Sequence, residues 1–291
     1  MADYAFRIVN VFAETPLAGN PLAVFEDGQG LDAAAMQALA LQFNLSETTF
    51  VLPSQDATAR VRIFTPSFEM PFAGHPTLGT AHVVRAMASG GDRVTLEMIA
   101  GIIPVAASGD VWTLTAGAPT VSAVAASRAE LAAMLGLAES DVAPDPAAPP
   151  LWVDTGSDQL IIPLASVDAV MRTKPRGDLM LAHASNGKRA MAYVFAHGSR
   201  GTPGAREAAP VAARFFFPKY GAVVEDPGTG SACANLGGWL IATGAPLPQR
   251  LAIAQGDEID RPCRLGLEVT ADRQIRVSGR VIELGRGSIR L

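Results

Sequence analysis

The chain contains 291 residues, a length typical of two domains of ordinary size. Hydrophobic residues make up 49% of it and charged residues 18%, which is enough apolar material for folded cores and excludes a disordered chain. The net charge of −5 and the lack of a dense Lys/Arg cluster argue against a nucleic-acid partner. No signal peptide is apparent, and no apolar run approaches the ~20 residues of a membrane span, so we expect a cytoplasmic protein without a membrane partner.

The cysteines and histidines form no pattern typical of a disulfide scaffold or a metal site. Two cysteines, Cys233 and Cys263, are too few for a scaffold and are consistent with a reduced compartment. The four histidines are scattered, and neither a Cys-x-x-Cys nor a His-x-x-x-His pair occurs. We therefore expect no metal site.

The first part of the chain is predicted to be mostly β-strand, with one helix. Asp32 is placed to cap a helix over residues 33–42, where apolar residues recur at helical spacing. The segment 47–51 is rich in Thr, Phe and Val and is typical of a strand. The strands expected here lie at residues 6–12, 22–25, 47–51 and 59–64.

The strand 59–64 opens a motif that the chain repeats later. Arg62-Ile63-Phe64-Thr65-Pro66 recurs as Arg214-Phe215-Phe216-Phe217-Pro218, and the offset is 214 − 62 = 152. If no gap is allowed, this offset aligns Gly74 with Asp226 and Thr77 with Thr229. Each copy leads into a helix, over 77–89 and 229–243, that has no polar face and should be buried on most sides. Two copies predict two similar domains facing each other, each with a sheet curled around a central helix.

The segments between the two copies and after them are predicted in less detail. Ser127 and Glu130 form a capping-box signature for a helix over 128–135. The Pro/Ala-rich segment 141–150 is interpreted as an inter-domain linker, and 199–210 as a loop. The other expected elements are strands at 94–106, 111–116, 152–164, 190–196 and beyond 251, and short helical segments at 166–171 and 177–182.

The starts of the two central helices suggest a binding site for an anion. A helix N-terminus presents free backbone N–H groups and a partial positive charge. Two such ends directed into one site between the domains would bind a small anion such as a carboxylate. The expected partner is therefore a small anionic substrate.

Four motifs follow one another along nearly the whole chain. They are Asn10-Val11-Phe12 with Gly19–Val24, Ser46–Val51, Phe64-Thr65-Pro66 with Gly74–Gly79, and Glu225–Ala232. Each motif is weak alone, but the four in order are specific, and together they resemble the PhzF family of phenazine-biosynthesis-like isomerases.

The resemblance implies an α+β fold of the diaminopimelate epimerase type, with two pseudo-symmetric domains, each a curled β sheet around a central buried helix. The expected domains are residues 1–120, completed by the last strand at about 280–291, and residues 121–279. The family's activity is isomerisation of trans-2,3-dihydro-3-hydroxyanthranilate by a proton shift, without a metal or an organic cofactor. A homodimer is also implied, whereas the substrate of this chain is left open.

Glu47, His75 and Asp226 are the candidate catalytic residues. A carboxylate is out of character in the strand 47–51, and the family pattern places its catalytic glutamate at Glu47. Burial of a carboxyl group raises its pKa toward the range that a proton shuttle needs. His75 could donate a hydrogen bond or relay a proton, and Asp226 could hold a polar substituent. A solvent-facing Glu, a packing His and a capping Asp are the simpler interpretations.

The candidate substrate-binding residues surround the helix starts. Gly74, Gly230 and Ser231 would offer backbone N–H groups and one hydroxyl to a carboxylate. Asn20, between Gly19 and Pro21, could line the site, although turn chemistry alone explains it.

Two other functions remain open at this point. A racemase or epimerase of the same fold would use two facing cysteines, expected near Gly74 and Asp226, and neither position is Cys. Cys233, about two turns into its helix with Ala81 as its repeat partner, is interpreted as a packing residue. A non-catalytic small-acid binding protein is the other alternative, which Glu47 disfavours because binding alone needs no carboxylate beside an anion site.

Overall fold

The structure is a computed structural model that describes residues 1–88, 90–198, 208–219 and 221–291. The chain is mostly sheet with several helices, and it divides into two compact units. Unit 1 contains Met1–Thr115 and Ser278–Leu291, and unit 2 contains Ala116–Val277. The expected loop at 199–210 lies largely outside the described residues.

Unit 1 is built from a ring of strands. Their pairings close a cycle in the order β1–β2–β3–β4–β6–β7–β8–β17–β1, and the short β5 pairs with β4. The pairs β2–β3 and β4–β6 are parallel. The strands are β1 (Asp3–Val11), β2 (Asn20–Phe25), β3 (Glu47–Leu52), β4 (Ala59–Phe64), β5 (Glu69–Met70), β6 (Arg93–Met98), β7 (Gly101–Ser108), β8 (Val111–Thr115) and β17 (Ile275–Arg290).

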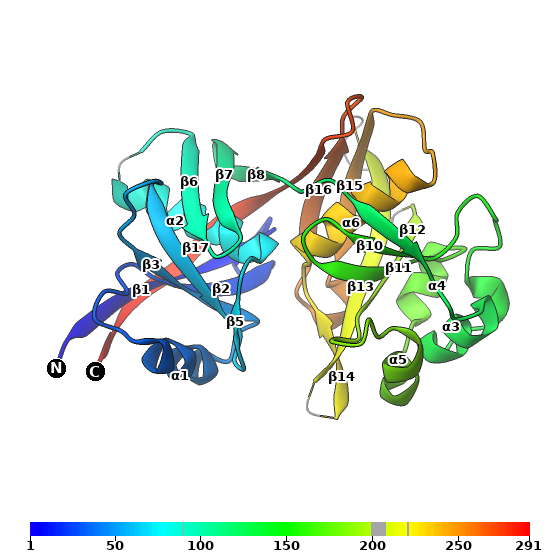
Figure 1. Ribbon diagram of the computed structural model, residues 1–291, viewed down its shortest axis with the longest axis horizontal. Helices are drawn as coiled ribbons and strands as arrows, with labels where there is room; N and C mark the ends of the chain where they lie inside the picture. The colour runs from blue at the N-terminus through cyan, green and yellow to red at the C-terminus, as the bar shows by residue number, and fades with distance from the viewer. Residues whose placement is uncertain (89, 199–207, 220) are drawn as a thin grey trace. The chain divides into compact units, whose positions relative to one another are not determined.

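The helix α2 (Gly74–Ala88) lies inside this ring and packs against β1, β2, β3, β4, β6, β7 and β8 (Figure 1). All residues from Gly74 to Ala81 are buried. Gly79 permits the close approach, because a Cβ there would lie 2.6 Å from Leu22 Cδ2 and 2.9 Å from Val11 Cγ2. The predicted burial of this helix is confirmed, although it begins three residues before the expected Thr77.

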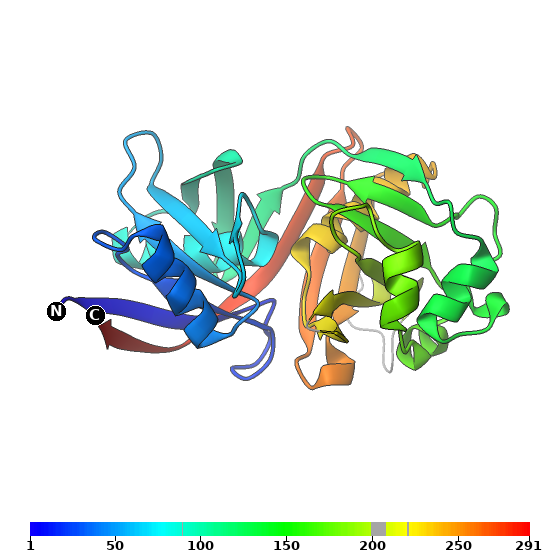
Figure 2. The same ribbon diagram turned by 60° about the horizontal axis from the view of Figure 1, so that its bottom comes forward.

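The helix α1 (Ala33–Phe43) lies on the outside of unit 1 against β3 and β4 (Figure 2). Asp32 caps it as predicted, since its carboxylate accepts a hydrogen bond from the Ala35 N–H at 2.8 Å. Phe43, the last residue of α1, packs against Phe25 in an aromatic cluster, in which the Phe25 and Phe50 rings stack with centroids 4.8 Å apart.

Unit 2 has a sheet in which the strands follow the order β9–β10–β11–β12–β13–β15–β16, with β14 added to β13. Its central helix α6 (Gly230–Ala242) contacts β9, β10, β11 and β16. Every residue of α6 from Ala232 to Leu240 is buried, which confirms the second predicted central helix. The strands are β9 (Thr120–Ala123), β10 (Leu151–Asp154), β11 (Asp158–Pro163), β12 (Ala192–His197), β13 (Ala209–Lys219), β14 (Ala222–Asp226), β15 (Gln249–Gln255) and β16 (Cys263–Val269).

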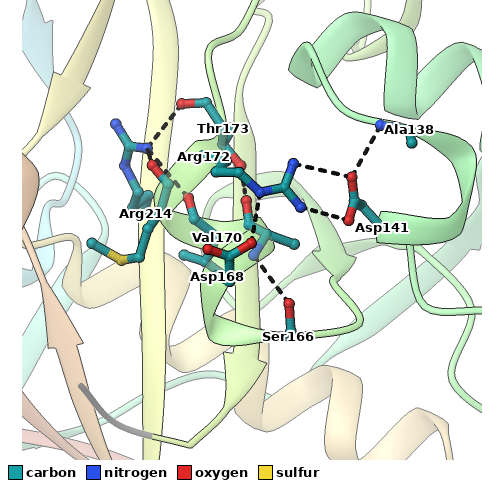
Figure 3. A network of polar contacts seen from close by, with 10 residues as sticks. Ala138, Asp141, Ser166, Asp168, Val170, Arg172, Thr173 and Arg214 are labelled. Carbon is teal, nitrogen blue, oxygen red and sulfur yellow. Dashed lines mark hydrogen bonds and ion pairs between the residues drawn. The ribbon is translucent and has the colours of Figure 1, made fainter. Parts of the chain in front are cut away.

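Three short helices, α3 (Arg128–Leu135), α4 (Val167–Arg172) and α5 (Gly177–His183), form a second layer in unit 2. The side chains of β11 alternate between the two layers. Leu160 and Ile162 join the core beneath the three helices, whereas Gln159 contacts α6. Arg214 holds the C-terminus of α4, because its Nη1 donates to the carbonyl oxygens of residues 170, 171 and 173 at 2.8–3.2 Å (Figure 3).

The interpretation of 141–150 as an inter-domain linker is wrong. This segment lies inside unit 2. Val142 is fully buried and bridges to Leu164, and the Ala143 N–H donates to the Pro163 carbonyl at 3.0 Å. Proline and alanine content indicated a linker, but these backbone contacts anchor the segment to the sheet of unit 2.

The internal repeat is confirmed by the topology, with one correction to its register. The pairing pattern of β1 to β7 recurs in β10 to β16, including both parallel pairs. Arg62 and Arg214 each bind a glutamate, Glu69 or Glu225, through two nitrogens. Phe64 is opposite Glu69 and Phe216 is opposite Glu225, so the offset grows from 152 to 225 − 69 = 156.

The second hairpin is therefore four residues longer, and the ungapped mapping of the helix starts is wrong. Gly74 corresponds to Gly230, not to Asp226, and Thr77 corresponds to Cys233, not to Thr229. The backbone agrees, because the Thr77 N–H donates to the Ala73 carbonyl at 3.2 Å and the Cys233 N–H donates to the Thr229 carbonyl at 3.0 Å.

Candidate functional site

Three candidate residues come together in unit 1: Asn20, Glu47 and His75. Asn20 opens β2 and Glu47 opens β3, and the parallel pairing of these strands puts both residues at the same end of the sheet. His75, the second residue of α2, lies between them. Its Nε2 is 3.5 Å from Glu47 Oε2, and its Nδ1 is 3.5 Å from Asn20 Nδ2. The Glu47 side chain is 15% exposed, so it is not the solvent-facing carboxylate of the simpler interpretation.

The ring of His75 is neutral at neutral pH. Burial lowers the pKa of His75 from its ordinary value of 6.5 to about 3, and a hydrogen bond to the Pro21 carbonyl offsets only part of this effect. Its contact with Glu47 is therefore one between a neutral imidazole and a carboxyl group. The hydrogen bond to the Pro21 carbonyl requires a protonated ring nitrogen, and the roles of Nδ1 toward Asn20 and of Nε2 toward Glu47 depend on which of the two carries the proton.

Gly74 and His75 form the first turn of α2, and both are buried. The first N–H groups of a helix have no partner within the helix, and they lie at the positive end of its dipole. Pro76 has no N–H group and occupies a first-turn position where none is needed. The start of α2 therefore combines a buried positive end, a neutral imidazole and the Glu47 carboxyl within one unit.

In unit 2, Asp226 ends β14 and lies in a hydrogen-bonded group with Thr229 and Gln255. Gln255 is fully buried, and its amide is oriented by the backbone, because its Oε1 accepts from the Thr229 N–H and its Nε2 donates to the Asp226 carbonyl at 2.9 Å. The same Nε2 is 3.0 Å from Thr229 Oγ1, and that hydroxyl donates to Asp226 Oδ2. The carboxylate of Asp226 thus accepts a hydrogen bond from a side-chain hydroxyl at the start of α6.

Gly230 and Ser231 are the first two residues of α6. Gly230 is buried and Ser231 is half-buried. Ser231 Oγ accepts a hydrogen bond at 2.9 Å from Nε2 of Gln159, a buried residue of β11. By the corrected offset of 156, Ser231 corresponds to His75. Each unit therefore holds the second residue of its central helix with an amide side chain from the sheet, Asn20 in unit 1 and Gln159 in unit 2.

The cysteines are packing residues in the structure. Both are free and buried, and burial raises the pKa of each thiol. Cys233 is the fourth residue of α6, so the expected position two turns into the helix, with Ala81 as its counterpart, is wrong. The true counterpart is Thr77, and neither thiol is set to ionise near neutral pH as a racemase base requires.

Sequence reasoning missed the buried amides Gln159, Asn235 and Gln255. Asn235 lies in the middle of α6 and is fully buried. A polar amide within an otherwise apolar helix or strand was visible in the sequence, as Glu47 was, and burial of such a group requires partners. The structure brings Asn20, Glu47 and His75 together in unit 1, and Asp226, Gly230 and Ser231 lie near one another along unit 2. The predicted role of both helix starts in binding one anion stays a prediction.

Within the described residues, no group of three or more His, Cys, Asp or Glu side chains is placed to hold a metal ion. Among the same residues, none of the helices is long and apolar enough to cross a membrane.

Comparison with known proteins relates the chain to one family over nearly its full length. The family model described as phenazine biosynthesis-like protein (PhzC-PhzF) matches residues 9–287. An uncharacterized isomerase of Pasteurella multocida is 38% identical, over 99% of this chain and 95% of that protein. Trans-2,3-dihydro-3-hydroxyanthranilate isomerase of Pseudomonas aeruginosa is 37% identical, over 90% of this chain and 89% of that enzyme. A crystal structure of a PhzF family protein from Bacillus anthracis matches with a TM-score of 0.87 at 26% identity, and the match covers 100% of both chains.

The repeat, the buried central helices and the carboxyl group beside the start of α2 are thus found in a chain whose relatives are named isomerases. The chain belongs to the phenazine biosynthesis-like (PhzC-PhzF) protein family and is an isomerase of that family.

Proposed function

We propose that the chain is a cofactor-independent isomerase that moves a proton within a small amino or carboxylic acid, with Glu47 as the general acid and base. The observation that carries the proposal is the position of Glu47, whose Oε2 is 3.5 Å from His75 Nε2 at the buried start of α2. A carboxyl group there can remove a proton from a carbon that is acidified by conjugation and return it to another carbon on the same face of the substrate.

In this proposal, the neutral His75 helps Glu47 without competing for the proton. Its low pKa leaves it uncharged at neutral pH, so it lies beside Glu47 without trapping the proton that Glu47 carries. Gly74, Gly230 and Ser231 hold the carboxylate of the substrate, and Asn20 and Asp226 hold its polar substituents. A homodimer in the cytoplasm remains part of this proposal.

A substrate similar to trans-2,3-dihydro-3-hydroxyanthranilate is the first to test, because a relative at 37% identity is named for that isomerisation. A racemase or epimerase with two thiol bases is the weaker alternative, since burial raises the pKa of Cys233 and Cys263. A protein that only binds small acids is the other alternative, and proton exchange separates it from the proposal.

The test is solvent-deuterium incorporation into trans-2,3-dihydro-3-hydroxyanthranilate and a panel of other unsaturated amino and carboxylic acids, followed by mass spectrometry. We expect turnover with the wild type, and a loss of at least ~10²-fold in Glu47→Gln with little change in binding, because general acid–base catalysis is typically worth ~10²–10⁴-fold. Cys233→Ser is the matched control and should keep turnover. Activity that survives Glu47→Gln but disappears in folded Cys233→Ser would contradict the proposal, and binding without exchange across the panel would favour the binding protein.

A further inference from the structure

The buried amides Gln159 and Asn235 form a hydrogen-bond chain that ends at Ser231, and the direction of every bond in it is determined. Asn235 Oδ1 accepts from the Thr155 backbone N–H at 3.0 Å and from the Thr155 hydroxyl at 2.7 Å. Its Nδ2 donates to the Ser157 carbonyl at 2.7 Å. A backbone N–H can only donate and a carbonyl can only accept, so the two ends of the Asn235 amide cannot be exchanged.

The orientation of Asn235 sets that of Gln159. The second hydrogen of Asn235 Nδ2 is donated to Gln159 Oε1 at 2.9 Å. The Oε1 end of Gln159 is thus the accepting end, and its Nε2 must donate to Ser231 Oγ at 2.9 Å. Both amides are buried, with exposures of 2% for Gln159 and 0% for Asn235, so water cannot readily replace these partners.

The hydrogen-bond chain uses only the oxygen of the Ser231 hydroxyl, so the hydroxyl hydrogen is available to an acceptor outside the hydrogen-bond chain. The oxygen of that hydroxyl is occupied as an acceptor by Gln159, and within the described residues Ser231 Oγ has no other hydrogen-bond partner. Ser231 lies on the first turn of α6, at the end of the helix that favours negative charge. Without Gln159, the hydroxyl could equally present a lone pair to a ligand, which would repel a carboxylate oxygen.

We infer that Gln159 and Asn235 are positioning residues that hold the Ser231 hydroxyl as a hydrogen-bond donor to a carboxylate of the substrate. Thr155 and Ser157 supply the fixed backbone ends, and the amides transmit their direction to the helix start. This inference rests on the proposed function for the identity of the ligand, but the direction of the hydrogen bonds rests on the structure alone.

The decisive variant is Gln159→Glu, which keeps the shape and replaces the donating Nε2 by an accepting oxygen. The Ser231 hydroxyl then turns to donate to Glu and presents its lone pairs to the ligand. The probe is 3-hydroxyanthranilate, a stable aromatic acid, and its Kd is measured by calorimetry. We expect Ser231→Ala to weaken binding about 10-fold or more, the value of one hydrogen bond to a charged group, and Gln159→Glu to weaken binding at least as much.

A double-mutant cycle separates the direction of the hydroxyl from the added charge. If Gln159→Glu acts through Ser231, most of its effect disappears in the Ser231→Ala background. An equal loss in both backgrounds means that charge repulsion alone is at work and overturns the inference. Gln249→Glu in β15 is the charge control, because Gln249 lies at the start of another strand and contacts Pro246, and it should leave Kd unchanged. Gln159→Met frees the Ser231 hydroxyl without reversing its direction, so it should weaken binding of 3-hydroxyanthranilate less than Gln159→Glu does. It replaces Gln159→Glu in the cycle if that variant does not fold.

A second measurement needs no ligand and distinguishes failure of this inference from failure of the proposed function. In ¹⁵N-labelled protein, the side-chain amide signal of Gln159 should exchange slowly with solvent and shift in Ser231→Ala, with a smaller shift at Asn235. An unshifted Gln159 signal overturns the inference. If the Gln159 signal shifts in Ser231→Ala but the wild type does not bind 3-hydroxyanthranilate, the hydrogen-bond chain is supported and the proposed carboxylate substrate is not.

Discussion

At the scale of single residues, His75 shows how burial selects one protonation state. Its folded-state pKa of about 3 lies below the ordinary value of 6.5, so the unfolded chain takes up the proton first as the pH falls. The stability linked to His75 is fully present above pH ~6.5 and is lost as the pH falls toward 3. Between pH 7 and pH 4.5 we expect a loss of roughly 2–3 kcal/mol from this residue.

Urea unfolding of the wild type and of His75→Gln at pH 7, 5.5 and 4.5 measures this effect. Carboxyl groups titrate in the same range in both proteins, so the quantity of interest is the difference between their free energies of unfolding. Gln keeps a polar side chain beside Glu47 and cannot take up the proton, so the free-energy advantage of the wild type should shrink as the pH falls. A constant difference from pH 7 to 4.5 would show that His75 is not held neutral by burial.

At the scale of elements, the central helices depend on glycines that let strands approach. Gly238 lies in α6, and a Cβ there would come 2.7 Å from Val153 Cγ1 and 2.8 Å from Pro119 Cβ. Both neighbours are stiff side chains. Gly238→Ala should therefore destabilise the protein by about 1–3 kcal/mol through overpacking, although alanine is the better helix former by about 1 kcal/mol.

Gly177→Ala is the matched control for this prediction. Gly177 opens α5, and a Cβ there would meet Val223 Cγ2 at 3.5 Å, an ordinary contact. This substitution should be neutral or slightly stabilising. Thermal unfolding followed by circular dichroism compares the two variants, and a Gly238→Ala protein at least as stable as Gly177→Ala would refute the packing argument.

At the scale of the whole molecule, β17 completes unit 1 with residues from the far end of the chain. It pairs with β1 from Asp3↔Arg290 to Val11↔Val281, and it also pairs with β8. Arg7 of β1 bridges Glu26 and Glu283 at 2.5 Å and 2.9 Å. A chain that ends at Val277 should leave β1 and β8 as open edges and expose the core around α2.

Limited proteolysis tests this dependence. In the chain that ends at Val277, fragments of unit 1 should be degraded quickly, whereas residues 116–277 should remain protected. Removal of Arg290 and Leu291 alone is the control, because it removes only the exposed pair between Arg290 and Asp3 and the end of the β1–β17 ladder, where Ala2 and Leu291 exchange two backbone hydrogen bonds. Equal resistance of unit 1 in both truncated chains would mean that the ring does not need β17.

Local features determined much of this structure. Capping residues marked α1 and α3 at Asp32 and Ser127, since a cap is a contact between neighbours in the chain. The repeated Arg-x-Phe-x-Pro motif indicated two copies of one topology, and apolar composition identified both central helices as buried. Glu47 was identified from the sequence because a carboxylate is unusual in a strand that otherwise consists of Thr, Phe and Val residues.

The tertiary structure alone decided the register of the repeat and the partners of the buried polar groups. The four-residue insertion lies in a hairpin, and only the pairing of Phe216 with Glu225 reveals it. The segment 141–150 belongs to unit 2 because of backbone bonds to β11 that composition does not encode. Gln159 is 76 residues from Asn235 and 72 residues from Ser231 in the sequence. The direction of the hydrogen bonds among these three side chains depends on backbone groups that only folding brings to Asn235. Sequence identifies which residues are unusual for their surroundings, but only the fold brings together the partners that determine what they do.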